Sequence, residues 1–467
     1  MQCCTILCQY HIKALGKNEF ITLSPIANPA ARLPSIFQPS TAAPSPIYYY
    51  IIFYLPHRFG KIRCTRALAP PPLPNAKMLT ILFSLLKEPI LLLLSLLHPR
   101  FKRDHFAPHP TVPFEAYYTR ILTPEATILL ILSSVRRATH KPHYVHFSYL
   151  PHPSSPSGGE SLRVDLFPTI TDQRLPRVAG SNVQPFRRIV GGGIGEYAVT
   201  PEKQAYSLHL PGGVEVDVQL TERTPWHKGE ELSSPEGALG ELVHLLPIHW
   251  HVFSIDSRAE YHIRIPGRAG QEEISGIGRA HIEKNWGVAF PSGWAWAQAF
   301  SPPTPSETAP SNDNGEFKLS LAGGKTLFQK AYLLSYTSPT TTLRFKPPFS
   351  LLPLTLSTPF CSEEIDSRAG LFKISMADFT HKIVLTIKGP EMHRGWIGLH
   401  CPLSGGHGNV FAYENFEGVV EVCVFRRRFE GWGYKWREVE RKRMDGCALE
   451  FGGGYSFRVR AEGGKFD

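Results

Sequence analysis

The sequence predicts an all-β protein with two antiparallel β-barrels side by side and a poorly structured N-terminal extension. Three observations lead to this fold class. Apolar and polar residues alternate in short runs from Ser161 onward, which is typical of half-buried strands. Glycine and proline turn signals separate these runs, as they do in sandwiches and barrels. A proline-rich polar stretch at residues 301–315 divides the strand-rich region into two blocks of similar size.

The expected strands follow one another at short intervals. The alternating runs lie at residues 162–166, 214–220, 261–265, 294–300, 317–321, 383–387, 420–424 and 455–459. Turn signals lie at residues 211–213, 266–270, 322–324, 388–390 and 452–454. The best helical candidate, residues 234–246, is short. Helices are therefore expected to contribute little to the fold.

Composition divides the chain into four predicted segments. Residues 1–150 hold 16 Lys or Arg against 5 Asp or Glu and none of the 8 tryptophans, whereas the remaining residues hold 34 against 35. The basic excess thus belongs to the start of the chain, and we expect no nucleic-acid partner. We hypothesise that this start is a misassigned coding region. The predicted segments are an extension without a packed core (1–145), a first barrel (146–300), a linker (301–315) and a second barrel (316–467).

The most apolar stretch, residues 78–97, lies in the extension. Lys87, Glu88 and Pro89 at its centre leave two runs that are each too short to span a bilayer. The start of the chain has neither the pattern of a secretory signal nor a convincing transit peptide. The sequence therefore predicts no compartment, and peripheral contact with a membrane stays an alternative.

Two segments invite catalytic interpretations that the rest of the chain does not support. The run RIVGGGIGEY at 188–197 resembles the activation site of trypsin-like proteases, but no Gly-Asp-Ser-Gly-Gly segment occurs. The helix that a dinucleotide-binding loop requires is also not expected after it, so we predict a turn between strands. His249 and His251 share a strand face, with His262 or His281 as a third candidate ligand, but their spacing fixes no metal site and we predict none.

The densest group of chemically informative residues lies at 281–300, HIEKNWGVAFPSGWAWAQAF. A strand at its end carries Trp294, Trp296, Gln298 and Phe300 on one face. Aromatic side chains with one amide among them are typical of a site for a bulky hydrophobic ligand. The alternative is that these aromatic side chains fill a barrel core.

The order Glu-Lys-Asn-Trp-Gly, then Phe-Pro, then alternating tryptophans that end in glutamine resembles the tocopherol cyclases of plants and cyanobacteria and their fungal relatives. Flanking segments agree in order: 249–263 before it, and Lys346–Phe349, 393–406 and 413–425 after it. The resemblance covers residues 160–460 and implies paired lipocalin-type barrels. One departure concerns the Phe-Glu-Gly-Trp-Tyr motif with which the family opens. Nothing comparable is recognised before Ser161, and a near echo lies at residues 429–434.

The resemblance implies an intramolecular lyase or isomerase that closes a chromanol ring by adding a phenol hydroxyl to a prenyl alkene. Such a step needs a Brønsted acid, a dry pocket and aromatic faces that stabilise a cation, and we expect no cofactor. Glu283 is the first candidate acid, because a carboxyl beside aromatic side chains can retain its proton. A surface ion pair between Glu283 and Lys284 is the alternative. Asp256 and His251 are further catalytic candidates.

The candidate substrate-binding residues come from the same segment and from the strand before it. They are Trp250, Lys284, Asn285, Trp286, Trp294, Trp296 and Gln298. The expected partner is a hydrophobic small molecule such as a prenylated quinol. Two other hypotheses stay open: a lipocalin-like protein that binds terpenoid or prenyl ligands without catalysis, and an inactive product of a damaged coding region. The sequence predicts no oligomeric state.

Overall fold

The computed structural model describes residues 104–153, 155, 160–237, 240, 246–268, 272–301, 317–326, 329–346, 351–353, 360–392, 394–430 and 433–461. The predictions for residues 1–103, including the apolar stretch at 78–97, lie outside these ranges. So do almost all of the predicted linker, Pro347–Phe349 and most of the helical candidate at 234–246.

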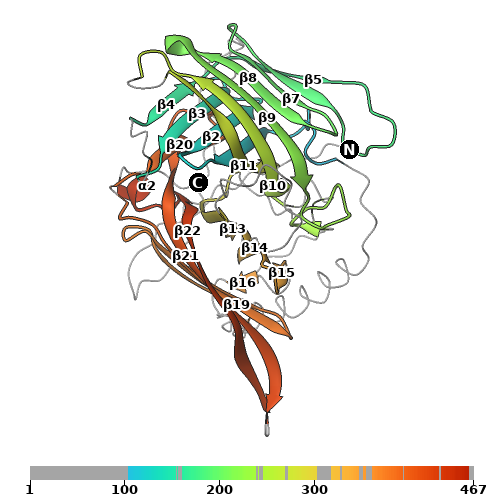
Figure 1. The fold of residues 1–467 in the computed structure, drawn as a ribbon, viewed down its shortest axis with the longest axis vertical. Helices are drawn as coiled ribbons and strands as arrows, with labels where there is room; N and C mark the ends of the chain where they lie inside the picture. The colour runs from blue at the N-terminus through green and yellow to red at the C-terminus, as the bar shows by residue number, and fades with distance from the viewer. Residues whose placement is uncertain are drawn as a thin grey trace, which may run out of the picture. The chain divides into compact units, whose positions relative to one another are not determined.

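The described chain forms two large, curled antiparallel sheets (Figure 1), which confirms the all-β fold class. The first sheet has the strand order β4-β3-β2-β1-β11-β10-β9-β8-β7-β6-β5. Its strands are β1 (Phe114–Leu122), β2 (Ala126–Val135), β3 (His143–Pro151), β4 (Leu162–Leu166), β5 (Ile170–Arg174), β6 (Phe186–Val190), β7 (Gly195–Val199), β8 (Gln204–Leu210), β9 (Val214–Thr224), β10 (Ile248–Arg264) and β11 (Glu273–Gly287).

The second sheet has the order β15-β14-β13-β12-β22-β21-β19-β18-β17, with β16 paired to β14 and β20 to β21. Its strands are β12 (Gly293–Phe300), β13 (Lys318–Thr326), β14 (Gln329–Thr337), β15 (Thr342–Phe345), β16 (Leu351–Pro353), β17 (Cys361–Asp366), β18 (Leu371–Ala377), β19 (His381–Lys388), β20 (Ile397–His400), β21 (Val410–Glu430) and β22 (Gly433–Gly453). A short 3-10 turn, η1 (Pro211–Gly213), and a short helix, α2 (Phe457–Ala461), complete the elements.

The first sheet begins earlier than the sequence predicts, because β1, β2 and the start of β3 lie within residues 1–145. Every residue of β1 and β2 is buried. Ile128 and Leu130 pack in one hydrophobic core and Leu129 and Ile131 in the other. A strand that is buried on both faces does not alternate between apolar and polar residues. A search for such alternation therefore misses it.

The division between the sheets also differs from the predicted boundary at residue 300. β12 pairs with β13 and β22 of the second sheet, whereas the first sheet ends with β11 at Gly287. The connection between β11 and β12 contains Pro291, which donates no ladder hydrogen bond. The change of sheet therefore takes place at residues 288–292, inside the motif that the sequence presents as one unit.

Two further predictions have opposite outcomes. The glycine-rich run at 188–197 is a turn between β6 and β7, as predicted, and Gly192 and Gly193 have the positive φ angles that favour glycine. The strand predicted at 455–459 is wrong, because these residues enter α2. There the Ser456 carbonyl accepts a hydrogen bond from the Arg460 amide, as in a helical turn. Five residues are too few to distinguish the two-residue period of a strand from the 3.6-residue period of a helix.

The buried residues form two hydrophobic cores. One lies inside the first sheet, and the other combines the second sheet with the opposite face of β1, β2 and β10. Cys401 and Cys447 are buried free thiols. Among the described residues, no helix has both the length and the apolar character needed to cross a bilayer.

Candidate functional site

The candidate site is organised by β11, which pairs with β1 on one side and β10 on the other. Glu283 is opposite Tyr118 and Val252, whereas the next residue, Lys284, is opposite Tyr117 and His251. Successive side chains on a strand point to opposite faces. The Glu-Lys-Asn-Trp motif is therefore divided between two buried environments, which we call the Glu283 face and the Lys284 face.

On the Glu283 face, two indole N–H groups and one imidazole nitrogen converge on one carboxylate oxygen. The indole Nε1 atoms of Trp250 and Trp296 each lie 2.9 Å from Glu283 Oε2, and His281 Nε2 lies 3.0 Å from it. All four side chains are buried. Hydrogen bonds to a charged acceptor are stronger than neutral ones, so Glu283 fixes the orientation of two tryptophans from different sheets.

Two more carboxyl groups reach this face from the second sheet. Glu450 on β22 is opposite both Trp296 on β12 and Glu414 on β21. Trp294 Nε1 donates to Glu450, and the Tyr118 hydroxyl donates to Glu414 Oε1 at 2.5 Å. The Trp294 indole packs over Gly452, where a Cβ would lie 2.0 Å from the ring. Glycine at this position therefore creates the space for the indole.

Burial makes these two carboxyl groups unusual acids. Desolvation raises the pKa of Glu414 well above its usual range, and the nearby Glu450 charge raises it further. Desolvation also raises the pKa of Glu450 to about 7, against the lowering effect of the Trp294 hydrogen bond. Glu414 Oε2 is buried and has no hydrogen-bond partner among the described residues. Glu414 is thus a buried carboxyl with a raised pKa and with one oxygen that no described residue contacts through a hydrogen bond.

A buried guanidinium completes the Glu283 face. Arg120 is fully buried, and its Nη1 donates to the backbone and side-chain oxygens of Gln298, while its Nη2 donates to the Gly446 carbonyl at 2.6 Å. Its Nε and Gln298 Nε2 have no partner within the described ranges, and no carboxylate there forms an ion pair with it. Two unused donors give this face a polar end beside its tryptophans.

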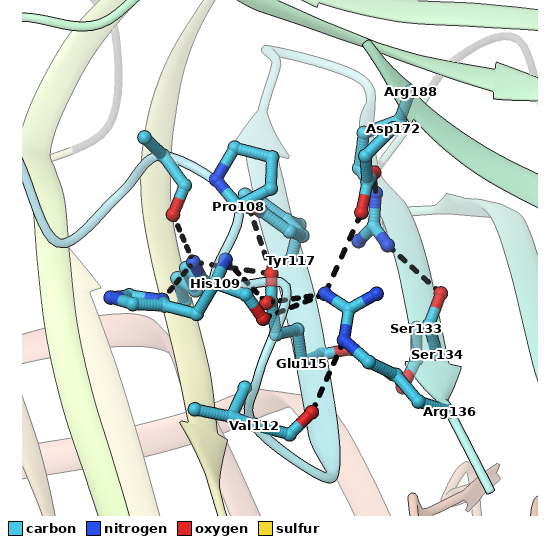
Figure 2. A network of polar contacts seen from close by, with 12 residues as sticks. Pro108, His109, Val112, Glu115, Tyr117, Ser133, Ser134, Arg136, Asp172 and Arg188 are labelled. Carbon is cyan, nitrogen blue, oxygen red and sulfur yellow. Dashed lines mark hydrogen bonds and ion pairs between the residues drawn. The ribbon is translucent and has the colours of Figure 1, made fainter. Parts of the chain in front are cut away.

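The Lys284 face carries a chain of alternating charges inside the first sheet (Figure 2). The distances are 3.3 Å from Lys284 Nζ to Glu115, 2.7 Å from Glu115 to Arg136, 3.7 Å from Arg136 to Asp172 and 2.8 Å from Asp172 to Arg188. Desolvation lowers the pKa of Lys284 to about 8, although Glu115 opposes the change.

The segment before β1 covers Lys284. Lys284 Nζ donates to the carbonyls of Phe106 at 3.3 Å and Ala107 at 2.6 Å, and it lies 2.9 Å from His109 Nδ1. The Glu115 carboxylate accepts from the His109 amide. All of the ammonium donors thus have acceptors in the protein, and Lys284 serves here to hold the segment inside the sheet.

Trp286 lies on the same face with several histidines. His109 and His249 stack against its indole with centroid distances of 4.8 and 5.0 Å. His251 is buried nearby, and desolvation lowers its pKa well below the usual value. His281 lies on the opposite face of β11, so it does not join His249 and His251. Across the described residues, no three His, Cys, Asp or Glu side chains form a group suited to a metal ion.

The predicted residues are therefore only partly brought together. Asp256 is held by Arg279 and Lys318, which lower its pKa against the effect of burial. Asn285 is partly buried opposite Trp250 on β10. The Glu283 face contains Trp250, Glu283, Trp294, Trp296 and Gln298, whereas the Lys284 face contains His251, Lys284 and Trp286.

Sequence reasoning missed Tyr118, Arg120, Glu414 and Glu450. One signal could have located the first two. The segment Phe114-Glu115-Ala116-Tyr117-Tyr118 has Phe, Glu and Tyr at the same places as the Phe-Glu-Gly-Trp-Tyr motif that was judged missing. This segment begins β1 and pairs with the Glu-Lys-Asn-Trp-Gly motif of β11. A segment with this partial likeness to the opening motif thus precedes Ser161, and it forms a buried strand.

Comparison with known proteins gives similarity at the level of fold. No protein-family model and no curated protein matches the sequence. The crystal structure of CghA has 9% identity and a TM-score of 0.46, and the match covers 75% of this chain and 94% of that one. The protein described as AttH from Nitrosomonas europaea has 12% identity and a TM-score of 0.41, over 76% of this chain and 96% of that one. These similarities carry no information on activity.

Proposed function

We propose that this protein is an acid-dependent cyclase of a hydrophobic, unsaturated small molecule. Within that class we propose a tocopherol cyclase-like reaction, in which a phenol hydroxyl adds to a prenyl alkene. One observation carries the proposal. Glu414 is a buried carboxyl with a raised pKa whose Oε1 accepts from Tyr118, while Oε2 has no partner in the described part of the chain.

The proposed step is an isomerisation and needs no other reactant. Glu414 Oε2 gives its proton to the less substituted alkene carbon, and a tertiary cation forms on the neighbouring carbon. The phenol oxygen attacks this cation, a C–O bond closes the ring, and the phenol proton returns to the Glu414 carboxylate. The faces of Trp294 and Trp296 stabilise the cation. Exclusion of water prevents the cation from being captured by a water molecule.

Glu283 has a different part in this proposal from the one the sequence predicts. Because its Oε2 already accepts two indole N–H groups and lies 3.0 Å from His281 Nε2, Glu283 is suited to orient Trp250 and Trp296. Asp256 is held in its charged form by two cations, and His251 lies on the other face. We therefore assign proton donation to Glu414, with Glu450 beside it, and propose that Arg120 and Gln298 hold the oxygen-bearing end of the substrate.

Turnover of a prenylated hydroquinone in D₂O tests the assignment. The expected product is a chromanol with the mass of the substrate plus one carbon-bound deuterium. Glu414→Gln should reduce the rate by about 10²- to 10⁴-fold while binding, measured by tryptophan quenching, persists. Glu260→Gln is the matched control, because Glu260 is exposed on β10.

Three results would contradict the proposal. Quenching by the substrate without any product would favour a protein that binds hydrophobic ligands. Full activity in Glu414→Gln would remove Glu414 as the acid, and a product without carbon-bound deuterium would exclude protonation of the alkene.

A further inference from the structure

The outer parts of β21 and β22 form a two-stranded ribbon that other strands do not cover. β19 pairs with β21 only as far as Arg426, and β12 pairs with β22 only from Ala448 onward. Beyond these points the two strands pair with each other, and the ribbon extends past β19 (Figure 1). We call residues 425–430 and 433–438 the outer ribbon; only its inner end, at Phe425 and Arg426, still pairs with β19 along one edge.

Both faces of the outer ribbon are exposed, and they differ in chemistry. On one face, Arg426 is opposite Arg437 and Arg428 is opposite Lys435. On the other face, Phe429 is opposite Tyr434 and Arg427 is opposite Trp436. Phe429, Tyr434 and Trp436 are 66%, 65% and 37% exposed. The ribbon therefore has one cationic face and one aromatic face.

This arrangement is unfavourable for a ribbon surrounded only by water. Like charges directly opposite one another destabilise a strand pair, and two such pairs follow in succession here. Residues 425–430 and 433–443 carry eight Lys or Arg against three Glu. Glu430 pairs with Arg437 and Glu438 with Arg441, whereas no carboxylate among the described residues forms an ion pair with Arg426, Arg428 or Lys435. An anionic partner would relieve this repulsion.

We propose that the outer ribbon docks this protein on an anionic membrane surface. Phe429 and Tyr434 are the last aromatic pair before the turn, and their ring centroids lie 5.3 Å apart. Arg428 and Lys435 lie one residue further from the turn, about 3 Å along the strands from this aromatic pair. Arg426 and Arg437 lie about 10 Å along the strands from it. Entry of the ribbon end into the interface places the aromatic pair below the lipid phosphates and the cations beside them.

The two-faced arrangement favours a membrane over nucleic acid. A single strand of nucleic acid bound along the cationic face would have to stack its bases on aromatic side chains. Here the aromatic side chains lie on the opposite face, so one strand would not reach both. A lipid interface surrounds the end of the ribbon and contacts both faces together. Such docking would also place the protein beside a store of hydrophobic substrate, but it does not depend on the proposed cyclase activity.

Sedimentation of the full chain with vesicles tests the proposal. We expect binding to phosphatidylcholine vesicles that contain phosphatidylserine, with affinity that falls as salt is added, and weak binding to phosphatidylcholine alone. Charge reversal by Arg428→Glu and Lys435→Glu should reduce binding about tenfold or more. Phe429→Ser with Tyr434→Ser should reduce binding while keeping its salt dependence.

Lys373→Glu with Lys388→Glu is the control for net charge, because both side chains are exposed on the second sheet away from the ribbon. These changes should leave vesicle binding unchanged, and circular dichroism should show native folding in every variant. Equal loss in the control, or equal binding to vesicles with and without phosphatidylserine, would overturn the proposal. Binding of a single-stranded oligonucleotide with no binding to vesicles would also overturn it and identify nucleic acid as the partner.

Discussion

The two faces of β11 use burial in opposite ways. On the Glu283 face, carboxyl groups from both sheets are close together, and burial raises the pKa values of Glu414 and Glu450. On the Lys284 face, Glu115 and Asp172 are paired with cations, and burial lowers the pKa of Lys284. One arrangement keeps an acidic proton, whereas the other holds a segment in place. Neighbouring residues of one motif thus belong to different sites, because the side chains of a strand alternate.

The largest expected effect on stability comes from removing a charge on the Lys284 face. Glu115→Gln takes away the carboxylate between Lys284 and Arg136. Breaking a buried pair in this way costs about 3–5 kcal/mol, which urea unfolding will measure. Combining it with Lys284→Met should recover part of the loss. Additive losses in the double variant would show that the two side chains do not interact.

A smaller effect is expected for the hydrogen bonds on the other face. Glu283→Gln weakens the acceptor for Trp250, Trp296 and His281, and we expect a loss of about 1–3 kcal/mol in the free energy of unfolding. The fluorescence spectrum should also change, because two indoles lose a charged acceptor. The control is Glu364→Gln, a change at an exposed residue of β17 outside both faces. An unchanged spectrum in Glu283→Gln would contradict the geometry.

The smallest effect distinguishes the faces by pH. Between about pH 4.5 and 7 the folded protein holds a proton on Glu450 that the unfolded chain has lost, so the contribution of Glu450 to the free energy of unfolding decreases as pH rises. Between about pH 8 and 10.5 the unfolded chain holds a proton on Lys284 that the folded protein has lost, so the contribution of Lys284 to the free energy of unfolding increases as pH rises.

Urea titrations at several pH values measure both slopes. Compared with the wild-type protein, Glu450→Gln should change the slope only between about pH 4.5 and 7, and Lys284→Met should change it only between about pH 8 and 10.5. If either variant changed both slopes, the two faces would not titrate independently.

Sequence patterns identified the fold class because strands such as β9 have one buried and one exposed face. They missed β1 and β2, which are buried on both faces. The motif at 283–298 located Glu283 and its tryptophans, but it could not show that Lys284 and Trp286 point the other way. Glu414 and Glu450 are each one of several acids on β21 and β22, and only the pairing of β12, β22 and β21 brings these two to Trp296.

The burial of β1 and of the second half of β11 on both faces also affects how the sequence can change over evolutionary time. Most strands of a protein have a solvent side where substitutions are nearly neutral, and these two strands lack one. A substitution that suits the Glu283 face must not disturb the backbone that also carries the Lys284 face. Likewise, a substitution that suits the Lys284 face must not disturb the Glu283 face. We expect relatives of this protein to differ least at residues 114–122 and 278–287, and to change there in pairs across the two strands.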